Sequence, residues 1–170
     1  MAQRREIRSY DYVNHPYERV REALDLDPRK VFAAATQAAS SRARSVASAL
    51  RVNLAGIEVG AEIDVDLRNV EHRPKDSPSG AATLLSIRWE AASRPRLFPL
   101  MDATLSVYAL TPTETQLDFL GRYEPPLGAL GGALDAVAGH RIAEASVHRF
   151  VSDVAAYLRN SLGKGPASHP

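Results

Sequence analysis

His140 is the residue of this sequence whose type and position most suggest chemistry. It lies in the segment 128–162, which contains no proline and carries apolar residues at helical spacing. At 100° per residue, His140 falls on the same side of the helix as Ala136 and Ala143, opposite Arg141. One interpretation is a core histidine whose ring nitrogens bond to a tyrosine, serine or carbonyl of a strand. The other is a polar group inside a pocket that orients a ligand or moves a proton.

Glu144 and His148 follow His140 at intervals of four residues, a spacing that could in principle hold a metal ion. The two side chains rotate progressively away from the apolar stripe, however, and no fourth ligand is nearby. The glycines between 128 and 132 resemble a phosphate loop only superficially, and they are better suited to easing the start of a helix. The sequence therefore predicts no metal or nucleotide cofactor, and no motif such as G-x-S-x-G assigns a catalytic residue.

The N-terminal part of the chain predicts one strand followed by two short helices. Residues 4–14 alternate loosely between polar and apolar side chains, which is typical of a strand. Pro16 lies at the first position of a predicted helix, and Asp27 is the predicted N-cap of a second helix that continues from Pro28. The polar stretch 40–45 predicts the end of that second helix.

Between residues 46 and 124 the hydrophobic period changes to two. Apolar and polar side chains alternate in successive runs, separated by a loop at 74–80 and a tight turn at 111–113. Strands joined by short turns, with one apolar face, form an antiparallel meander. The apolar positions that define the runs include Leu50, Val52, Leu54, Ile63, Val65, Leu67, Leu85, Ile87, Trp89, Leu105, Val107, Leu117, Phe119 and Tyr123.

The segment 128–162 predicts a long amphipathic helix that begins between 128 and 134 and ends before Gly163 as its C′ residue. The second half of the helix carries large apolar residues such as Phe150, whereas the same side of the first half carries glycine and alanine. Protein interiors contain few voids, so small residues facing a sheet imply one of two arrangements. Either sheet side chains approach closely there, or a cavity exists for a ligand.

The composition suits one ordinary globular domain. The chain has 170 residues, of which 45% are hydrophobic and 24% charged, and the predicted domain spans 1–170 with an ordered core of about 4–162. The absence of cysteine excludes disulfide scaffolds, zinc ribbons and thiol nucleophiles. A net charge of +1 disfavours electrostatic binding to nucleic acid or to an anionic membrane. No signal-peptide pattern or membrane-spanning apolar run is present, so a cytoplasmic location is expected.

The order of one strand, two short helices, antiparallel strands and a long C-terminal helix resembles the helix-grip fold of the START-related superfamily. This superfamily includes lipid-transfer domains, pollen-allergen-like ligand carriers and polyketide cyclase/dehydrase proteins. The resemblance covers about residues 4–162, and residues 97–158, LFPLMDATLSVYALTPTETQLDFLGRYEPPLGALGGALDAVAGHRIAEASVHRFVSDVAAYL, are similar to small actinobacterial members. It implies an α+β fold in which about six or seven antiparallel strands curve around the C-terminal helix. It also implies a ligand space between sheet and helix, but no universal catalytic residue.

Three functions are compatible with these features. The first is binding or carriage of a small hydrophobic molecule such as a lipid, isoprenoid or polyketide-like compound. The second is a polyketide cyclase, aromatase or dehydratase in which His140 and a tyrosine move protons. The third is an interaction module with a filled core, favoured by Ile142 alone, which helical phase places on the polar side of the helix. Strand parity and helical phase select the candidate cavity lining, which consists of His140, Ala136, Ala143, Trp89, Leu105, Val107, Phe119 and Tyr123.

Overall fold

The computed structural model describes residues 4–49, 63–91, 100–123 and 133–163. The elements are β1 (Arg5–Val13), α1 (Tyr17–Leu26), α2 (Pro28–Ala49), β2 (Ile63–Arg73), β3 (Ala82–Ala91), β4 (Met101–Thr111), β5 (Glu114–Tyr123) and α3 (Ala133–Leu162). The strands pair antiparallel in one sheet of order β1-β5-β4-β3-β2. The α+β class is confirmed. The described part contains five strands, fewer than the six or seven expected, and the alternating run at residues 50–54 lies outside the described residues.

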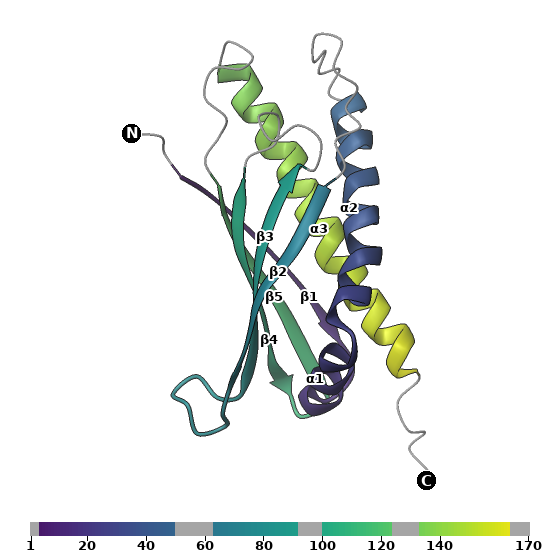
Figure 1. Cartoon of the computed structure of the whole chain (residues 1–170), viewed down its shortest axis with the longest axis vertical. Helices are drawn as coiled ribbons and strands as arrows, with labels where there is room; N and C mark the ends of the chain where they lie inside the picture. The colour runs from purple at the N-terminus through teal and green to yellow at the C-terminus, as the bar shows by residue number, and fades with distance from the viewer. Residues whose placement is uncertain (1–3, 50–62, 92–99, 124–132, 164–170) are drawn as a thin grey trace.

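Helices α2 and α3 lie side by side along one face of the sheet (Figure 1). The long helix α3 runs from the end of β5, where His140 contacts Tyr123, to the end of β1, where Arg159 contacts Tyr12. The start and end of α3 agree with the sequence prediction. The sheet therefore has a helix-facing side, which carries the core, and an outer side.

The second helix is longer than the sequence predicted. It spans 22 residues, Pro28–Ala49, so the expected end at 40–45 is wrong and this helix is not short. Residues 29–49 contain no glycine or proline, and serine and arginine cost little in a helix that packs against another one. The predicted N-cap is confirmed, because the amide of Lys30 donates to Asp27 Oδ1 at 3.0 Å.

The predicted position of Ile142 on the polar side of α3 is also wrong. Ile142 is buried, with 6% of its surface exposed, because α2 packs beside α3 and gives it a second buried side. Ser146, one turn further along, is buried too, and its hydroxyl donates to the Ile142 carbonyl at 2.6 Å. A helical-phase argument that assumes one buried side misses such residues.

An aromatic layer fills the core between the sheet, α2 and the second half of α3. The ring centroid of Phe150 lies 5.6 Å from that of Phe32, 5.2 Å from that of Trp89 and 6.3 Å from that of Phe119. The tilted and edge-to-face arrangements are those that aromatic rings favour. The second half of α3 therefore meets a filled core.

A buried histidine holds the C-terminal end of α3. Gly163 follows the helix with φ of +70°, the left-handed conformation of a C′ glycine, as the sequence predicted. His15, which is 3% exposed, donates from Nε2 to the Gly163 carbonyl at 2.9 Å. The Thr115 hydroxyl donates to the His15 carbonyl at 2.8 Å. These bonds join the segment after β1, the start of β5 and the end of α3.

We expect His15→Ala to lower the free energy of unfolding by about 1–3 kcal/mol, because the variant loses the hydrogen bond to the Gly163 carbonyl and the packing of the buried imidazole. Urea denaturation followed by circular dichroism measures the change. Lys75→Ala, in the exposed loop between β2 and β3, is the control and should change stability by less than about 0.5 kcal/mol. Equal stability of the two variants would show that this contact does not anchor α3.

Candidate functional site

A tyrosine and a histidine meet where α3 crosses the end of β5. The Tyr123 hydroxyl lies 2.5 Å from His140 Nδ1, and the two rings are stacked with centroids 6.0 Å apart and an interplanar angle of 21°. Tyr123 is buried and His140 is half-buried. When the imidazole carries its proton on Nε2, the phenol donates to Nδ1; when the proton is on Nδ1, the imidazole donates to the phenol oxygen. The sequence placed both residues on the interior side, and the structure brings them together.

The surroundings keep the Tyr123 phenol protonated. Burial raises the pKa of Tyr123 above its ordinary value, and the negative charge of Glu144 adds to this effect. The Arg5 guanidinium opposes the shift through its charge and a hydrogen bond, but the pKa remains raised. The hydroxyl therefore stays available as a hydrogen-bond donor at neutral pH.

Tyr123 belongs to a row of side chains that crosses the sheet. The strand register pairs it with Arg5 of β1 on one side and with Met101 of β4 on the other. Met101 in turn pairs with Trp89 of β3, and Trp89 pairs with Val65 of β2. The row thus joins the tyrosine–histidine pair to the aromatic layer of the core.

The next row of the sheet contains two short residues, Gly121 and Ala103, which pair with each other. A Cβ atom at Gly121 would collide with Sδ of Met101 and would lie 3.0 Å from Cε1 of Phe119. The Met101 side chain therefore occupies the space beside Gly121. Because methionine is unbranched and has several rotatable bonds, this part of the site can change shape more easily than the aromatic layer.

The structure places the other strand candidates in the core. Trp89, Leu105, Val107 and Phe119 are buried on the helix-facing side, and Trp89 and Phe119 pack against Phe150. On α3, Ala143 is half-buried, and the side chain of Ala136 lies outside the described residues. Their role as ligand lining stays a prediction.

Sequence reasoning missed Arg5 and Met101 as neighbours of Tyr123. Strand parity identifies which side chains share a face within one strand, but only the register tells which residues face one another across strands. The tight turn that the sequence predicted at 111–113 fixes the register of β4 and β5, and hence the pairing of Met101 with Tyr123. No such short turn signal fixes the pairing of β1 with β5.

The three residues with metal-compatible spacing, His140, Glu144 and His148, do not converge on one position. His140 contacts Tyr123, whereas His148 Nδ1 lies 3.3 Å from the Ser9 hydroxyl oxygen. Glu144 is exposed on the surface of α3. Among the residues that the structure describes, no group of three histidine or acidic side chains is placed to hold a metal ion.

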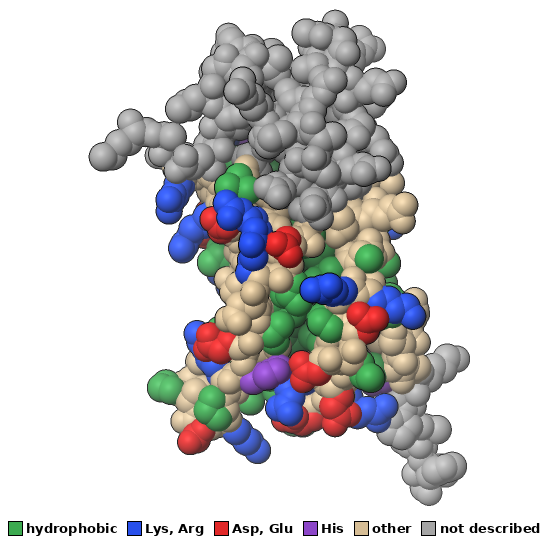
Figure 2. Space-filling model, viewed as in Figure 1, with side chains coloured by type: hydrophobic (Ala, Val, Ile, Leu, Met, Phe, Trp, Pro, Cys, Tyr) green, Lys and Arg blue, Asp and Glu red, His purple; other side chains and the backbone are tan. Residues whose placement is uncertain are grey.

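The outer side of the sheet carries alternating charges. The register aligns an acidic or basic residue from each strand in one row. Blue and red side chains are also interspersed over the face of the molecule that Figure 2 shows. In strand order this row consists of Glu6, Arg122, Asp102, Arg88 and Asp66. Opposite charges on neighbouring strands stabilise such a face modestly.

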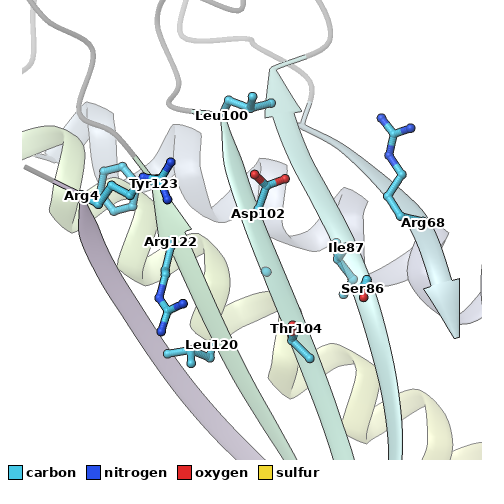
Figure 3. Close-up of a pocket in the computed structure, with 11 residues that line it drawn as sticks. Arg4, Arg68, Ser86, Ile87, Leu100, Asp102, Thr104, Leu120, Arg122 and Tyr123 are labelled. Atoms are coloured by element: carbon cyan, nitrogen blue, oxygen red, sulfur yellow. The ribbon is translucent and has the colours of Figure 1, made fainter. Parts of the chain in front are cut away.

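A hollow of about 680 Å³ lies beside this row (Figure 3). Short or apolar residues such as Ser86, Thr104 and Leu120 form part of its lining. Two of its arginines already have carboxylate partners, since Arg122 lies 3.5 Å from Glu6 and Arg68 lies 3.0 Å from Asp66. These two arginines stand on opposite sides of the hollow, so its charged groups do not converge on one ligand position. Residues of the outer side of the sheet, such as Asp102, Thr104 and Arg122, form much of its lining, and Tyr123 also borders it.

The sequence matches no protein-family model and no curated protein. Several solved structures resemble the fold. An aromatase/cyclase from a Streptomyces species is 12% identical, with 95% of this chain and 97% of that chain covered and a TM-score of 0.51. A protein from Thermus thermophilus is 14% identical, with 92% and 99% covered and a TM-score of 0.47. Norcoclaurine synthase from Thalictrum flavum, in complex with dopamine and hydroxybenzaldehyde, is 8% identical, with 95% and 90% covered and a TM-score of 0.44.

The likeness to the aromatase/cyclase extends over nearly the whole of both chains and concerns the fold. Together with the element order and the antiparallel sheet packed on α3, it shows that this chain has the helix-grip fold. Within the described residues, no helix combines the length and the apolar character needed to cross a bilayer.

Proposed function

We propose that this protein binds or carries a small hydrophobic molecule between the sheet and α3, with the Tyr123–His140 pair at the polar end of the ligand space. The observation that carries the proposal is the hydrogen bond between a buried phenol and a half-buried imidazole on the helix-facing side of the sheet. Sites for small molecules are mostly apolar and contain a few polar groups that fix orientation. This pair has that character, and a cytoplasmic location remains part of the proposal.

The distribution of large and small residues supports this end of the helix as the ligand space. The second half of α3 meets the aromatic layer around Phe150, which leaves no room for a guest. The first half carries alanine and glycine in the sequence, and Gly121 and Ala103 lie in the adjacent row of the sheet. Movement of the flexible Met101 side chain would open space beside Tyr123.

His140 provides the contact that would orient the guest. With its proton on Nε2, the imidazole accepts the Tyr123 phenol at Nδ1 and directs an N–H donor away from the tyrosine. That donor suits a carbonyl or hydroxyl oxygen on an otherwise apolar molecule. Burial of the apolar part would stabilise the complex by about 25 cal/mol per Å² of covered surface.

A polyketide cyclase, aromatase or dehydratase activity is the second candidate. The Tyr123–His140 pair favours it when the imidazole of His140 is in its other tautomer. With its proton on Nδ1, His140 donates to the Tyr123 oxygen, and the Tyr123 hydroxyl can donate to a guest carbonyl. The Nε2 lone pair is then available to accept a proton from the carbon beside that carbonyl. The positive charge of Arg5 near Tyr123 would stabilise the negative charge that develops on the oxygen.

The nitrogen chemical shifts of His140 separate the two candidates. Protonation on Nε2 in the presence of a guest such as 2-naphthol supports binding, whereas protonation on Nδ1 supports proton transfer. Incubation with a synthetic β-polyketone provides the second readout, because loss of water or ring closure changes its mass. The third candidate, an interaction module with a filled core, rested on the predicted exposure of Ile142. Ile142 is buried, so this candidate has no remaining support.

We expect His140→Leu to preserve the fold and to weaken binding of 2-naphthol by about tenfold, the effect of losing one hydrogen bond of roughly 1.4 kcal/mol. Naphthalene, which has no hydroxyl, should bind the variant and the parent protein equally well. Isothermal titration calorimetry measures both affinities. His148→Leu, on the exposed part of the same helix, is the matched control and should leave both affinities unchanged. An equal loss for the two guests would show that His140 supports packing rather than orientation.

A further inference from the structure

Strand β1 is an edge of the sheet, and its outer edge borders a groove. It pairs with β5 on one side, and no other described strand pairs with it. On the other side, β1 and α3 enclose a groove of about 620 Å³. This groove is remote from the Tyr123–His140 pair and contains neither residue.

One contact reveals which backbone groups of β1 face the groove side. Arg159 of α3 donates from Nη1 to the Tyr12 carbonyl at 2.6 Å, and it lies 3.6 Å from Asp11 Oδ1. The Tyr12 carbonyl therefore points away from β5. Since the N–H and C=O groups of one strand residue point to the same side and alternate along the strand, those of Tyr10, Arg8 and Glu6 also point to this edge. Arg159 covers this edge at Tyr12, near the C-terminal end of β1. No described strand pairs with Glu6, Arg8 or Tyr10 on this side.

The groove has the length of a short extended segment. Its helix wall runs from Arg141 to Ser152, which corresponds to about 16 Å at 1.5 Å per residue. An extended chain covers this distance in about five residues. The small residue Ala145 lines the groove. The Ser9 hydroxyl oxygen lies 3.3 Å from His148 Nδ1, and this contact joins β1 to α3.

One arginine of the groove, Arg141, favours an acidic occupant. Arg8, Arg141 and Arg149 line it against one acidic residue, Glu144. Arg8 is held by Asp118 at 2.7 Å and Arg149 by Asp153 at 3.2 Å. Arg141 has no ionic partner within the described part of the chain, so its charge is available to a partner.

We propose that an extended, acidic polypeptide segment of a partner protein docks on the outer edge of β1 and fills the groove beneath α3. Its backbone would pair with Glu6, Arg8 and Tyr10, and one of its carboxylates would meet the guanidinium of Arg141. A second copy of this chain fits less well, because two β1 edges would bring their arginine rims together. A small anion would use the arginines but none of the outward backbone groups.

The direct test uses a heptapeptide that alternates glutamate with threonine, and the same peptide with lysine in place of glutamate. On adding the acidic peptide, amide hydrogen exchange of Glu6, Arg8 and Tyr10 should slow at least about tenfold in the bound state. The lysine peptide should not change it. Shifts of Arg141 and His148 without protection of these amides would indicate a small-anion site, and a rise in mass by light scattering would indicate a second copy. Either outcome would overturn the proposal.

Two variants separate the backbone contribution from the charge contribution. Tyr10→Pro removes an N–H that points away from β5, so the sheet ladder is retained, and it should abolish protection. Tyr10→Ala, which removes only an exposed side chain, is the matched control and should bind as the parent does. Arg141→Glu should weaken binding of the acidic peptide at least about tenfold and reduce the salt dependence of that binding. Undiminished binding by the charge-reversed protein would contradict the proposal even if Tyr10→Pro fails to fold.

Discussion

Phe150→Ala should lower the free energy of unfolding by about 3–5 kcal/mol, the typical loss when a buried phenylalanine is truncated. Phe150 has no exposed surface, and its ring contacts aromatic rings from α2, β3 and β5. Its removal leaves a cavity that rigid neighbours such as Trp89 cannot fill. Urea denaturation, followed by the fluorescence of Trp89 and by circular dichroism, measures the loss.

Phe150→Leu is the matched variant for this experiment, since it retains most of the apolar volume. It should lower the free energy of unfolding by less than half as much as Phe150→Ala does. Arg149→Ala, one residue earlier on the exposed side of α3, should have an effect below about 0.5 kcal/mol. A decrease of less than about 1 kcal/mol in the free energy of unfolding for Phe150→Ala would show that the aromatic layer is not what stabilises the core.

Gly121→Val should destabilise the protein by about 1–3 kcal/mol, as overpacking of a core does. The first added carbon collides with Met101 Sδ, and the branches of valine require further movement towards Phe119. The same change should weaken binding of 2-naphthol, because valine blocks the space beside Gly121 and keeps Met101 from moving there to make room for the guest next to Tyr123. Thermal and urea denaturation measure stability, and calorimetry measures the affinity.

Leu120→Val provides the control on the neighbouring position of β5, which faces the outer side of the sheet. It should change stability by less than about 1 kcal/mol and leave the affinity intact. Full stability and full affinity of Gly121→Val would show that the space beside Met101 is open, contrary to the packing described above.

The parts of the fold that local chemistry determines were predictable from the sequence. Alternation of apolar residues identified β2 to β5, and Asp27 and Gly163 marked helix ends through the caps they form. The end of α2 was not predictable in this way, because the polar stretch at 40–45 continues as helix beside α3. Tertiary packing there outweighs the local preference of the sequence.

The candidate site was predictable only in part for a related reason. Helical phase directed His140 inward, and strand parity placed Tyr123 on the same side as Phe119. Their hydrogen bond depends on where α3 crosses β5, which no local pattern encodes. Ile142 illustrates the same difficulty, since its burial depends on the packing of α2 against a second side of α3.

The position of a bound guest tests the central claim most directly. Intermolecular nuclear Overhauser effects between 2-naphthol and isotope-labelled protein identify the side chains that touch it. The account predicts contacts with Tyr123, His140 and the Met101 methyl group, on the helix-facing side of the sheet. Contacts confined to Leu120 and Thr104 in the outer hollow, or no contacts at a saturating concentration of 2-naphthol, would contradict it.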